Sequence, residues 1–564
     1  MKFSEMQYTR PDTEGAKEEV KALTARLEEA SSFADAREAL VAFDRMERRL
    51  ETMSTLAHIR HTLDTRDEFY KEEKHFWNTT YPELHEFFNA FRKALLRTPY
   101  RTEFEAEFGD VTFLNAELDE KSFSRDIIEN LQEENELSQA YQSLLAQAMV
   151  SFEGGEYTLP QMTAFKTDAD DVRRLAAWKA EGQWYKDHQK ELDDFYDKLV
   201  KLRDEMGKKL GYENYLPMGY ARMQRNCYGV KEVEAFRKAV IDYVVPVADE
   251  VYRAQAKRIG ADYPLSFSDM ALQFRDGNPK PVGTPDDILA AGDSLYNGLG
   301  EETRAFWKVM RENELLDVLS REGKRGGGYM TELPDFGVPF IFANFNGTED
   351  DVDVVTHEAG HAFAGYLNMD RVPHDNILPS MEGAEVHSMS MEFFGERAAK
   401  AFFGKDADKY RYTHLSSSLT FIPYGTMVDH FQHIVYEKPD LTPAERHAEW
   451  KRLLGIYMPW VKLDGEIPFY AEGMGWQRQH HIYSMPFYYI DYCLAQTVAL
   501  TFWARILEDE EDAWKHYMAY TRLGGSKTFT ELLKAADLAS PFDAETLKGI
   551  CEKAAKYLYN HSKV

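Results

Sequence analysis

The sequence contains little cysteine and no long apolar run. Among its 564 residues only three are cysteines, Cys227, Cys493 and Cys551, too few and too widely spaced for a disulfide framework or a cysteine zinc cluster. No run of about 18 or more apolar residues occurs, so no membrane-spanning helix is predicted. The segment that begins at Met1 lacks the apolar stretch of a secretory signal. These absences predict a cytoplasmic protein without a membrane partner.

Positive charge is also scarce. The chain has 67 Lys and Arg residues against 96 Asp and Glu residues, which gives a net charge of −29. Proteins that bind nucleic acids carry stripes of Lys and Arg, and this sequence has none, so a nucleic-acid partner is not expected. The hydrophobic content of 44% is typical of a globular chain. Because single domains rarely exceed about 300 residues, the length predicts two or more lobes.

Helical periodicity dominates the sequence. Apolar residues recur at spacings of three and four through 14–209 and again through 230–259, where Pro246 predicts a kink or a break. The Pro/Gly-rich segment 260–286 predicts a loop, after which helix is expected as far as about Leu319.

The period changes shortly before residue 350. Tyr329, Phe340 and Phe345 belong to a segment of β-favouring residues interrupted by glycines and prolines, which predicts two short strands joined by a turn at 334–337. From Glu349 onward the helical pattern returns and continues to the end of the chain.

The most informative motif is an HExxH sequence at His357-Glu358-Ala359-Gly360-His361. It follows Thr348, a candidate N-cap, in a segment whose apolar residues predict a buried helix. Two histidines four residues apart project from one helix face and can hold one Zn²⁺ ion. Glu358 projects beside them, where it can take a proton from a zinc-bound water. The motif therefore predicts a hydrolytic zinc site, and the alternative is a helix with two unrelated histidines.

A catalytic zinc site needs a third protein ligand. Leu367 occupies the position where a metzincin has its third histidine, which leaves a downstream carboxylate. The spacing of thermolysin-like sites favours Glu382, whereas helix geometry favours Glu385, because Glu392 lies two turns further along the same face and can support it. The candidates are Glu382, Glu385, Glu392 and Glu396.

His357 and His361, followed by Glu385 and Glu392, resemble the motif of the thimet-oligopeptidase-like metallopeptidases, and in particular the oligoendopeptidase F (Pz-peptidase) branch. Three further segments are similar to that family, namely 339–348, 206–215 and 480–492. The resemblance extends over most of the chain after residue 200. It implies Glu385 rather than Glu382 as the third ligand, one zinc ion per chain and internal cleavage of oligopeptides.

Hydrogen-bond donors close to a tetrahedral oxyanion speed peptide hydrolysis, and the segment after residue 480 is rich in such donors. Ser484 and Pro486 predict a helix start, after which Tyr488 and Tyr492 share one face. The family resemblance implies that His481, Tyr488 and Tyr492 line the cleft.

The loop before this predicted helix departs from the family pattern. Relatives of the thimet type carry a Gly-Gly-Tyr loop where this chain has 484–486. The alignment to the family in this segment can therefore be placed differently, and His480 or Tyr489 are the alternative residues that line the cleft. Aromatic core packing is the other interpretation of the tyrosines. The predicted strand 329–333 could pair with an extended peptide if it lies at a sheet edge, or form a simple hairpin.

These observations predict a mainly α fold: a two-lobed helical clamshell with a deep central cleft and a small β-sheet beside the HExxH helix. We expect an N-terminal helical region at 1–195 and a zinc metallopeptidase region at 196–564, with interlocked lobes. A deep cleft admits flexible oligopeptides and excludes folded proteins. The sequence does not predict the oligomeric state.

The predicted function is therefore that of a zinc-dependent endopeptidase for short oligopeptides, with Glu358 as the general base. One alternative is a carboxy-dipeptidase of the same chemistry, which needs a positive group to bind the C-terminal carboxylate. The other is a zinc-holding, peptide-binding protein without turnover, although such a protein has no need of a base at Glu358.

Overall fold

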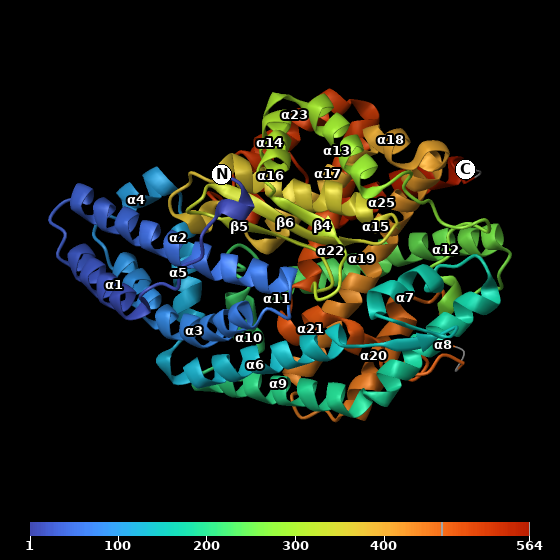
Figure 1. Cartoon of the computed structure of the whole chain (residues 1–564), viewed down its shortest axis with the longest axis horizontal. Coiled ribbons are helices and arrows are strands. Elements are labelled where there is room, and N and C mark those ends of the chain that lie inside the picture. The colour runs from blue at the N-terminus through green and yellow to red at the C-terminus, as the bar shows by residue number, and fades with distance from the viewer. Residues whose placement is uncertain (464–465, 563–564) are drawn as a thin grey trace.

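The structure is a computed structural model that describes residues 1–463 and 466–562. Helices make up most of it, and three small sheets occur among the described residues (Figure 1). The mainly α prediction is thus confirmed, whereas the two-lobed arrangement around a deep cleft stays a prediction.

Long helices form the N-terminal part of the chain. Several begin at a capping side chain: Asp12, Ser32 and Asp67 each accept a hydrogen bond from a backbone N–H of the first turn. Helices α1 to α5 lie together at one end of the molecule (blue in Figure 1). The bounds are α1 (Thr13–Glu28), α2 (Phe33–Leu63), α3 (Glu68–Leu96), α4 (Arg101–Phe108), α5 (Val111–Ser122), α6 (Ile128–Ala146), α7 (Leu159–Lys166), α8 (Asp171–Asp187) and α9 (Gln189–Lys209).

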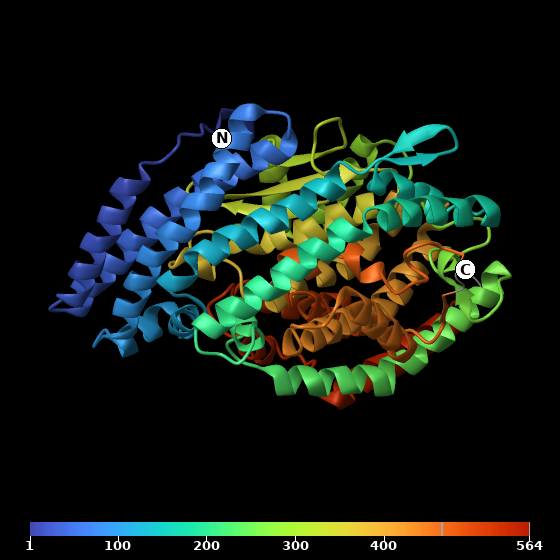
Figure 2. The same ribbon diagram turned by 90° about the horizontal axis from the view of Figure 1, so that it is seen from below.

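A short hairpin interrupts these helices and was not predicted from the sequence. Strands β1 (Val150–Phe152) and β2 (Gly155–Tyr157) pair antiparallel. Glu153 and Gly154 connect them with positive φ angles of 50° and 81°, a conformation that suits the twist of a two-residue hairpin loop. Figure 2 shows the hairpin projecting from the surface of the molecule.

The middle of the chain follows the predicted pattern of helix, loop and helix. A π-helical turn at Val240–Val244 ends two residues before Pro246, which confirms the predicted interruption. The segment 260–286 is mostly irregular, apart from a 3₁₀ turn and the short strand β3 (Leu265–Ser266), which pairs with β7 (Val461–Lys462). The helices are α10 (Leu216–Arg222), α11 (Val230–Ala239), α12 (Val245–Ile259), α13 (Pro285–Leu299) and α14 (Glu301–Glu312).

The main sheet has three strands in the order β4-β6-β5. Strands β5 (Tyr329–Leu333) and β6 (Val338–Phe345) form the predicted antiparallel pair. The expectation of helix to Leu319 was wrong, because β4 (Leu316–Leu319) pairs parallel with β6. This long-range pairing overrides the local helical pattern. Strand β5 lies at an edge of the sheet, as the peptide-pairing prediction requires.

The HExxH segment forms a helix with a π-helical turn inside it. The helix consists of α15 (Asp350–Asp353), the π turn Val354–Glu358 and α16 (Ala359–Asn368). Glu349 occupies the N-cap position in place of the predicted Thr348, whose hydroxyl still accepts the N–H of Asp350 at 3.3 Å. Figure 1 shows this helix beside the sheet and next to α17 (Met381–Gly395).

Helices α16 and α17 approach each other closely at Gly360. A Cβ atom at this position would lie 2.7 Å from the Cα of Ser388 and 2.9 Å from the carbonyl oxygen of His387. Real Cβ atoms do not tolerate such contacts, so only glycine permits the observed spacing. Gly360, directly before the second histidine of the motif, thus sets how near α17 can come.

Helices also account for most of the C-terminal part. The predicted core helix 492–507 lies within α22, and most of α22 is buried. The bounds are α18 (Ala399–Phe403), α19 (Ala407–Glu437), α20 (Pro443–Tyr457), α21 (His480–Ser484), α22 (Tyr489–Glu508), α23 (Glu510–Thr521), α24 (Phe529–Ala535) and α25 (Ala544–Asn560).

One hydrophobic core extends from Met6 to Leu558, and a second is confined to α1–α5. The predicted division between residues 195 and 196 stays a prediction, and it falls inside α9. Within the described ranges, none of the helices is both long and apolar enough to traverse a bilayer. The cytoplasmic location stays a prediction.

Buried charges link the N-terminal helices to the C-terminal ones. Arg203 on α9 is fully buried and donates to Glu134 of α6, to the hydroxyl of Tyr436 and to the backbone of Tyr483. Arg222 also pairs with Glu134, at 2.9 Å. Burial opposes ionisation of Glu134, but the two arginines outweigh it and lower the pKa of Glu134 to about 2.

The Glu134→Gln substitution is expected to lower the free energy of unfolding by about 3 kcal/mol at pH 7, since it removes the charge that compensates two buried guanidinium groups. The folded-state pKa lies below the ordinary value, so this contribution is present above about pH 4.5 and is lost as the pH falls towards 2. Chemical denaturation at several pH values measures it. Glu133→Gln, on the exposed face of the same helix, is the control. Equal stability of both variants at pH 7 would contradict the assignment.

The Gly360→Ala substitution tests the spacing of α16 and α17. The added methyl group must push the helices apart, so we expect a loss of about 1–3 kcal/mol in the free energy of unfolding. Gly365→Ala, one turn further along α16, is the matched control, because its Cβ would meet no atom closer than Glu332 Oε1 at 3.5 Å. Equal effects of the two substitutions would show that the close approach does not constrain the helices.

Candidate metal centre

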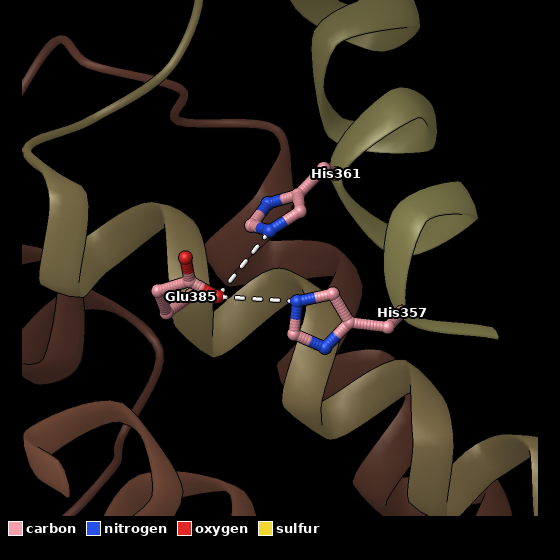
Figure 3. A group of neighbouring side chains, drawn as sticks. All are labelled: His357, His361 and Glu385. Carbon is pink, nitrogen blue, oxygen red and sulfur yellow. Dashed lines mark ion pairs between the residues drawn. The ribbon is translucent and has the colours of Figure 1, made fainter. Parts of the chain in front are cut away.

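Three side chains from two helices converge on one point (Figure 3). His357 lies in the π turn and His361 in the first turn of α16, while Glu385 lies on α17. Glu385 Oε2 is 3.4 Å from His357 Nε2 and 3.3 Å from His361 Nε2. One ligand atom from each residue lies within 4.8 Å of the other two. This is the trio that the sequence and the family resemblance predict.

The donor set fits a zinc ion. Two imidazole nitrogens and one carboxylate oxygen are ligands that zinc prefers, and three protein ligands leave a fourth position open. A hydrogen bond between His357 Nδ1 and Glu392 Oε1, at 2.6 Å, leaves Nε2 free to face the centre. Glu385 is almost fully buried, so its charge needs a positive partner, which a metal ion at this point supplies.

A chain of charged groups extends from His357 away from the centre. Glu392 accepts from His357 and, through its other oxygen, from His414 Nε2 at 2.9 Å. His414 Nδ1 lies 2.8 Å from Glu396 Oε1. Burial opposes the charged forms, but these pairings lower the pKa of Glu392 to about 2 and raise that of His414 to about 10. The chain holds the ring of His357 in a fixed orientation.

Sequence reasoning predicted a supporting role for Glu392 but missed His414. Glu392 and Glu396 stand four residues apart on consecutive turns, so a positive partner for the pair could have been expected. No local signal selects His414, because it lies on α19 and reaches Glu392 only through the packing of that helix.

Glu382, the competing third ligand, lies apart from the two histidines. Its side chain is buried, accepts from the hydroxyl of Ser380 at 2.8 Å and is not a member of the trio. Glu385 instead accepts from the hydroxyls of Tyr488 and Ser388. The structure therefore brings together Glu385 and the histidines, as the helix geometry and the family resemblance favoured.

Glu358 belongs to the π turn of the HExxH helix, and its side chain lies near the start of the edge strand β5. A Cβ atom on Gly328, the residue before β5, would be 3.8 Å from Glu358 Oε1. Among the described residues no side chain or backbone group donates a hydrogen bond to this carboxylate. Its oxygens are consequently free to bind a water molecule or a substrate group.

Tyr488 contacts Glu385, and the rings of His481 and Tyr492 pack against Tyr488. The hydroxyl of Tyr488 donates to Glu385 Oε1, and the rings of Tyr488 and Tyr492 are 4.7 Å apart between centroids. The hydroxyl of Tyr492 lies 3.4 Å from His481 Nε2. Burial, followed by the charge of His480, lowers the pKa of His481 to about 3, so its ring is neutral.

Within the described residues, no hydrogen bond links Tyr489 or His480 to Glu385. The ring of Tyr489 packs against His481 and Tyr492, with centroids 5.3 and 5.5 Å away, and against Phe421 and Tyr424 of α19 at 5.8 and 5.9 Å. The ring of His480 is tilted by 34° against that of His481, with the centroids 3.9 Å apart. The structure thus brings Tyr488 to Glu385, with His481 and Tyr492 next to Tyr488. The helix itself begins at Tyr489, later than Ser484 and Pro486 suggested.

Phe487 fixes the entry to this helix. Its φ angle is +68°, a left-handed conformation that is unfavourable for a bulky residue. Its N–H donates to Gln432 Oε1 at 3.0 Å, and its carbonyl accepts from Arg225. Its ring fills the space left by Gly219, where a Cβ atom would be 2.5 Å away. These contacts hold the strained turn and so direct the side chain of the next residue, Tyr488.

Two family models match the chain. The model of the peptidase M3 N-terminal domain matches residues 3–123, and that of peptidase family M3 matches residues 304–551. A curated relative, oligopeptidase PepF of Bacillus subtilis (strain 168), is 25% identical over 351 residues, which cover 57% of this chain and 50% of the relative. The match thus spans about half of that relative's length.

Solved structures resemble the whole chain. Pz peptidase A with an inhibitor is 41% identical, with a TM-score of 0.97, and the match covers 99% of each chain. A candidate oligoendopeptidase F is 42% identical, also with a TM-score of 0.97, and the match covers 100% of each chain. These matches confirm the resemblance seen in the sequence, and we conclude that the chain belongs to peptidase family M3.

Proposed function

We propose that the chain is a zinc-dependent endopeptidase that hydrolyses internal peptide bonds of short oligopeptides. The observation that carries this proposal is the trio His357, His361 and Glu385, with Glu358 beside it at the start of an edge strand. Membership of peptidase family M3 and the names of the relatives, oligopeptidase and oligoendopeptidase, support the same reaction.

His357, His361 and Glu385 would hold one zinc ion per chain. Bound there, zinc supplies a Lewis acid that polarises the scissile carbonyl and acidifies a water molecule. The trio fits this ion because the hydrogen bond from His357 to Glu392 directs Nε2 towards the centre.

Glu358 acts as the general base. It takes a proton from the attacking water and returns it to the amine that leaves, so it must stand beside the reacting groups with its oxygens free. Its position next to Gly328, without a hydrogen-bond donor among the described residues, supports this role.

Tyr488, Tyr492 and His481 donate hydrogen bonds to the oxyanion that forms during the reaction, for which the hydroxyl of Tyr488 turns away from Glu385. Phenol hydroxyls keep their protons at neutral pH, and a neutral imidazole has one N–H to donate. The three groups lie together beside Glu385, on side chains held by α22 and α21. Preorganised donors of this kind stabilise the transition state more than the substrate.

The substrate binds in an extended conformation along β5. An edge strand offers unpaired N–H and C=O groups that a peptide backbone can complete. His357 and His481 keep some solvent-accessible surface, so a bound peptide can reach them. We expect a cleft here that admits flexible peptides and excludes folded proteins.

The first prediction separates the base from the ligands. Glu358→Gln removes the base but no ligand, so about one zinc per chain should remain while kcat falls by roughly 10²–10⁴-fold. His357→Ala should lose the metal as well as activity. Elemental analysis and peptide hydrolysis, on protein purified without chelator, measure the two effects.

The matched pair Glu385→Gln and Glu382→Gln tests the third ligand. Both carboxylates are buried on α17, but only the first substitution should reduce zinc occupancy. Metal loss in Glu382→Gln with full occupancy in Glu385→Gln would make Glu382 the third ligand. For the preceding prediction, wild-type turnover by Glu358→Gln would contradict the role of Glu358 as base.

A second prediction concerns the oxyanion donors. Tyr488→Phe, Tyr492→Phe and His481→Ala should each lower kcat by roughly 10–10³-fold, while KM and zinc content change little. Tyr489→Phe and His480→Ala are the controls from the alternative register. Loss of kcat confined to the two controls would show that the register is shifted by one residue.

A further inference from the structure

Two cations near the start of β5 have no negative partner. Lys74 lies on α3, and Arg325 lies in the loop that leads into β5. Across the described ranges, no hydrogen bond or ion pair reaches Lys74 Nζ or the guanidinium of Arg325. Arg321 and Lys324, in the same loop, both pair with Asp317 at 2.7 Å. In a chain of net charge −29, two neighbouring unpaired cations need an explanation.

Two histidine side chains belong to the surroundings of the pair. Burial, and then the charge of Arg325, lowers the pKa of Lys74 to about 8. His58 and His61 on α2 each have a buried Nδ1 atom without a partner, and burial followed by the charge of Lys74 lowers the pKa of both. All four side chains remain partly accessible to solvent. The cluster therefore suits an anion that arrives from outside the chain.

The loop that carries Arg325 is firmly placed. The backbone N–H of Arg325 donates to the carbonyl of Thr62 at 2.8 Å, and the hydroxyl of Thr62 lies 2.6 Å from that of Tyr329. The side chain of Asn344 donates to the carbonyls of Arg325 and Gly327, at 2.8 Å each. These contacts fix the loop at the end of the sheet where β5 begins.

The cluster lies close to the proposed reacting groups. Gly328, three residues after Arg325, adjoins Glu358, so the Cα atoms of Arg325 and Gly328 are separated by at most about 11 Å. Burial, and then the charge of Arg325, also lowers the pKa of His480, whose ring lies against that of His481. An anion held by Arg325 would thus lie a few residues from the bond that is cleaved.

We propose that Arg325 and Lys74 bind the C-terminal carboxylate of the oligopeptide substrate. This inference rests on the proposed peptidase function and names a recognition element of the same site. A peptide that pairs with β5 brings one of its two charged ends to this cluster, and only the carboxylate end has the complementary charge. The two cations can each offer charge-assisted hydrogen bonds to a carboxylate group.

The same charge fixes the direction of the peptide. With its C-terminus at the start of β5, the peptide runs antiparallel to the strand; a parallel peptide would place its ammonium group against Arg325 and Lys74.

The test compares one unstructured peptide in two forms, with a free C-terminal carboxylate and with a C-terminal amide. Calorimetry with the zinc-loaded Glu358→Gln variant measures Kd, and hydrolysis by the unsubstituted enzyme measures KM and kcat. We expect the free acid to bind about 10- to 100-fold more tightly than the amide, since a hydrogen-bonded charge is lost in the amide. The difference should appear in KM rather than in kcat.

Variants of the two cations give the decisive comparison. Arg325→Gln and Lys74→Gln should each weaken binding of the free acid and leave binding of the amide unchanged, while Arg325→Lys should retain part of the preference. Arg321→Gln is the matched control, because that arginine lies in the same loop but is already paired with Asp317. It should preserve the full difference between acid and amide.

Two results would overturn the inference. Equal affinity of the unsubstituted site for acid and amide would show that no carboxylate is recognised, and equal loss for both peptides in Arg325→Gln and Lys74→Gln would show a structural role. Failure of the enzyme to cleave either peptide would instead contradict the proposed peptidase function itself. Products that are always C-terminal dipeptides would support the inference and shift the proposed activity to the carboxy-dipeptidase alternative.

Discussion

The close contact between α16 and α17 is the constraint on which the centre depends. Two histidines one turn apart on a single helix present two nitrogen ligands. A carboxylate from another helix can join them only if the two helices are close enough for the side chains to meet. Gly360 permits this approach, because any side chain there would collide with the backbone of Ser388. Glu385 then lies 3.3–3.4 Å from both histidines. Gly360, in the middle of the HExxH motif, thus has a packing role, whereas the two histidines at its ends have a chemical one.

Burial of charge explains the groups around this contact. A buried carboxylate is costly unless positive groups or hydrogen-bond donors compensate it. Glu385 and Glu392 are both enclosed, and together they outweigh the effect of burial and raise the pKa of His357. A proton on His357 can compensate this negative charge. A divalent cation can compensate it as well, and it leaves the imidazole neutral, as a metal ligand must be.

The sequence predicted the parts of the centre that depend on spacing along one element. The HExxH histidines, the two strands before them and the helix that carries Glu385 follow from local patterns. Strand β4 and the hairpin β1–β2 were missed, since β4 exists through its pairing with β6, and each hairpin strand is only three residues long. His414 and Arg225 were missed for the same reason, because each reaches its partner through the packing of a distant segment.

The central claim is that the trio on α16 and α17 holds one catalytic zinc ion. Anomalous X-ray diffraction at the zinc absorption edge, from crystals of protein prepared with zinc and without chelator, tests it most directly. The account predicts one strong peak at about 2.0–2.2 Å from Nε2 of His357, Nε2 of His361 and a carboxylate oxygen of Glu385, with a fourth position open. A peak coordinated by Glu382, or no peak between the two histidines, would contradict it.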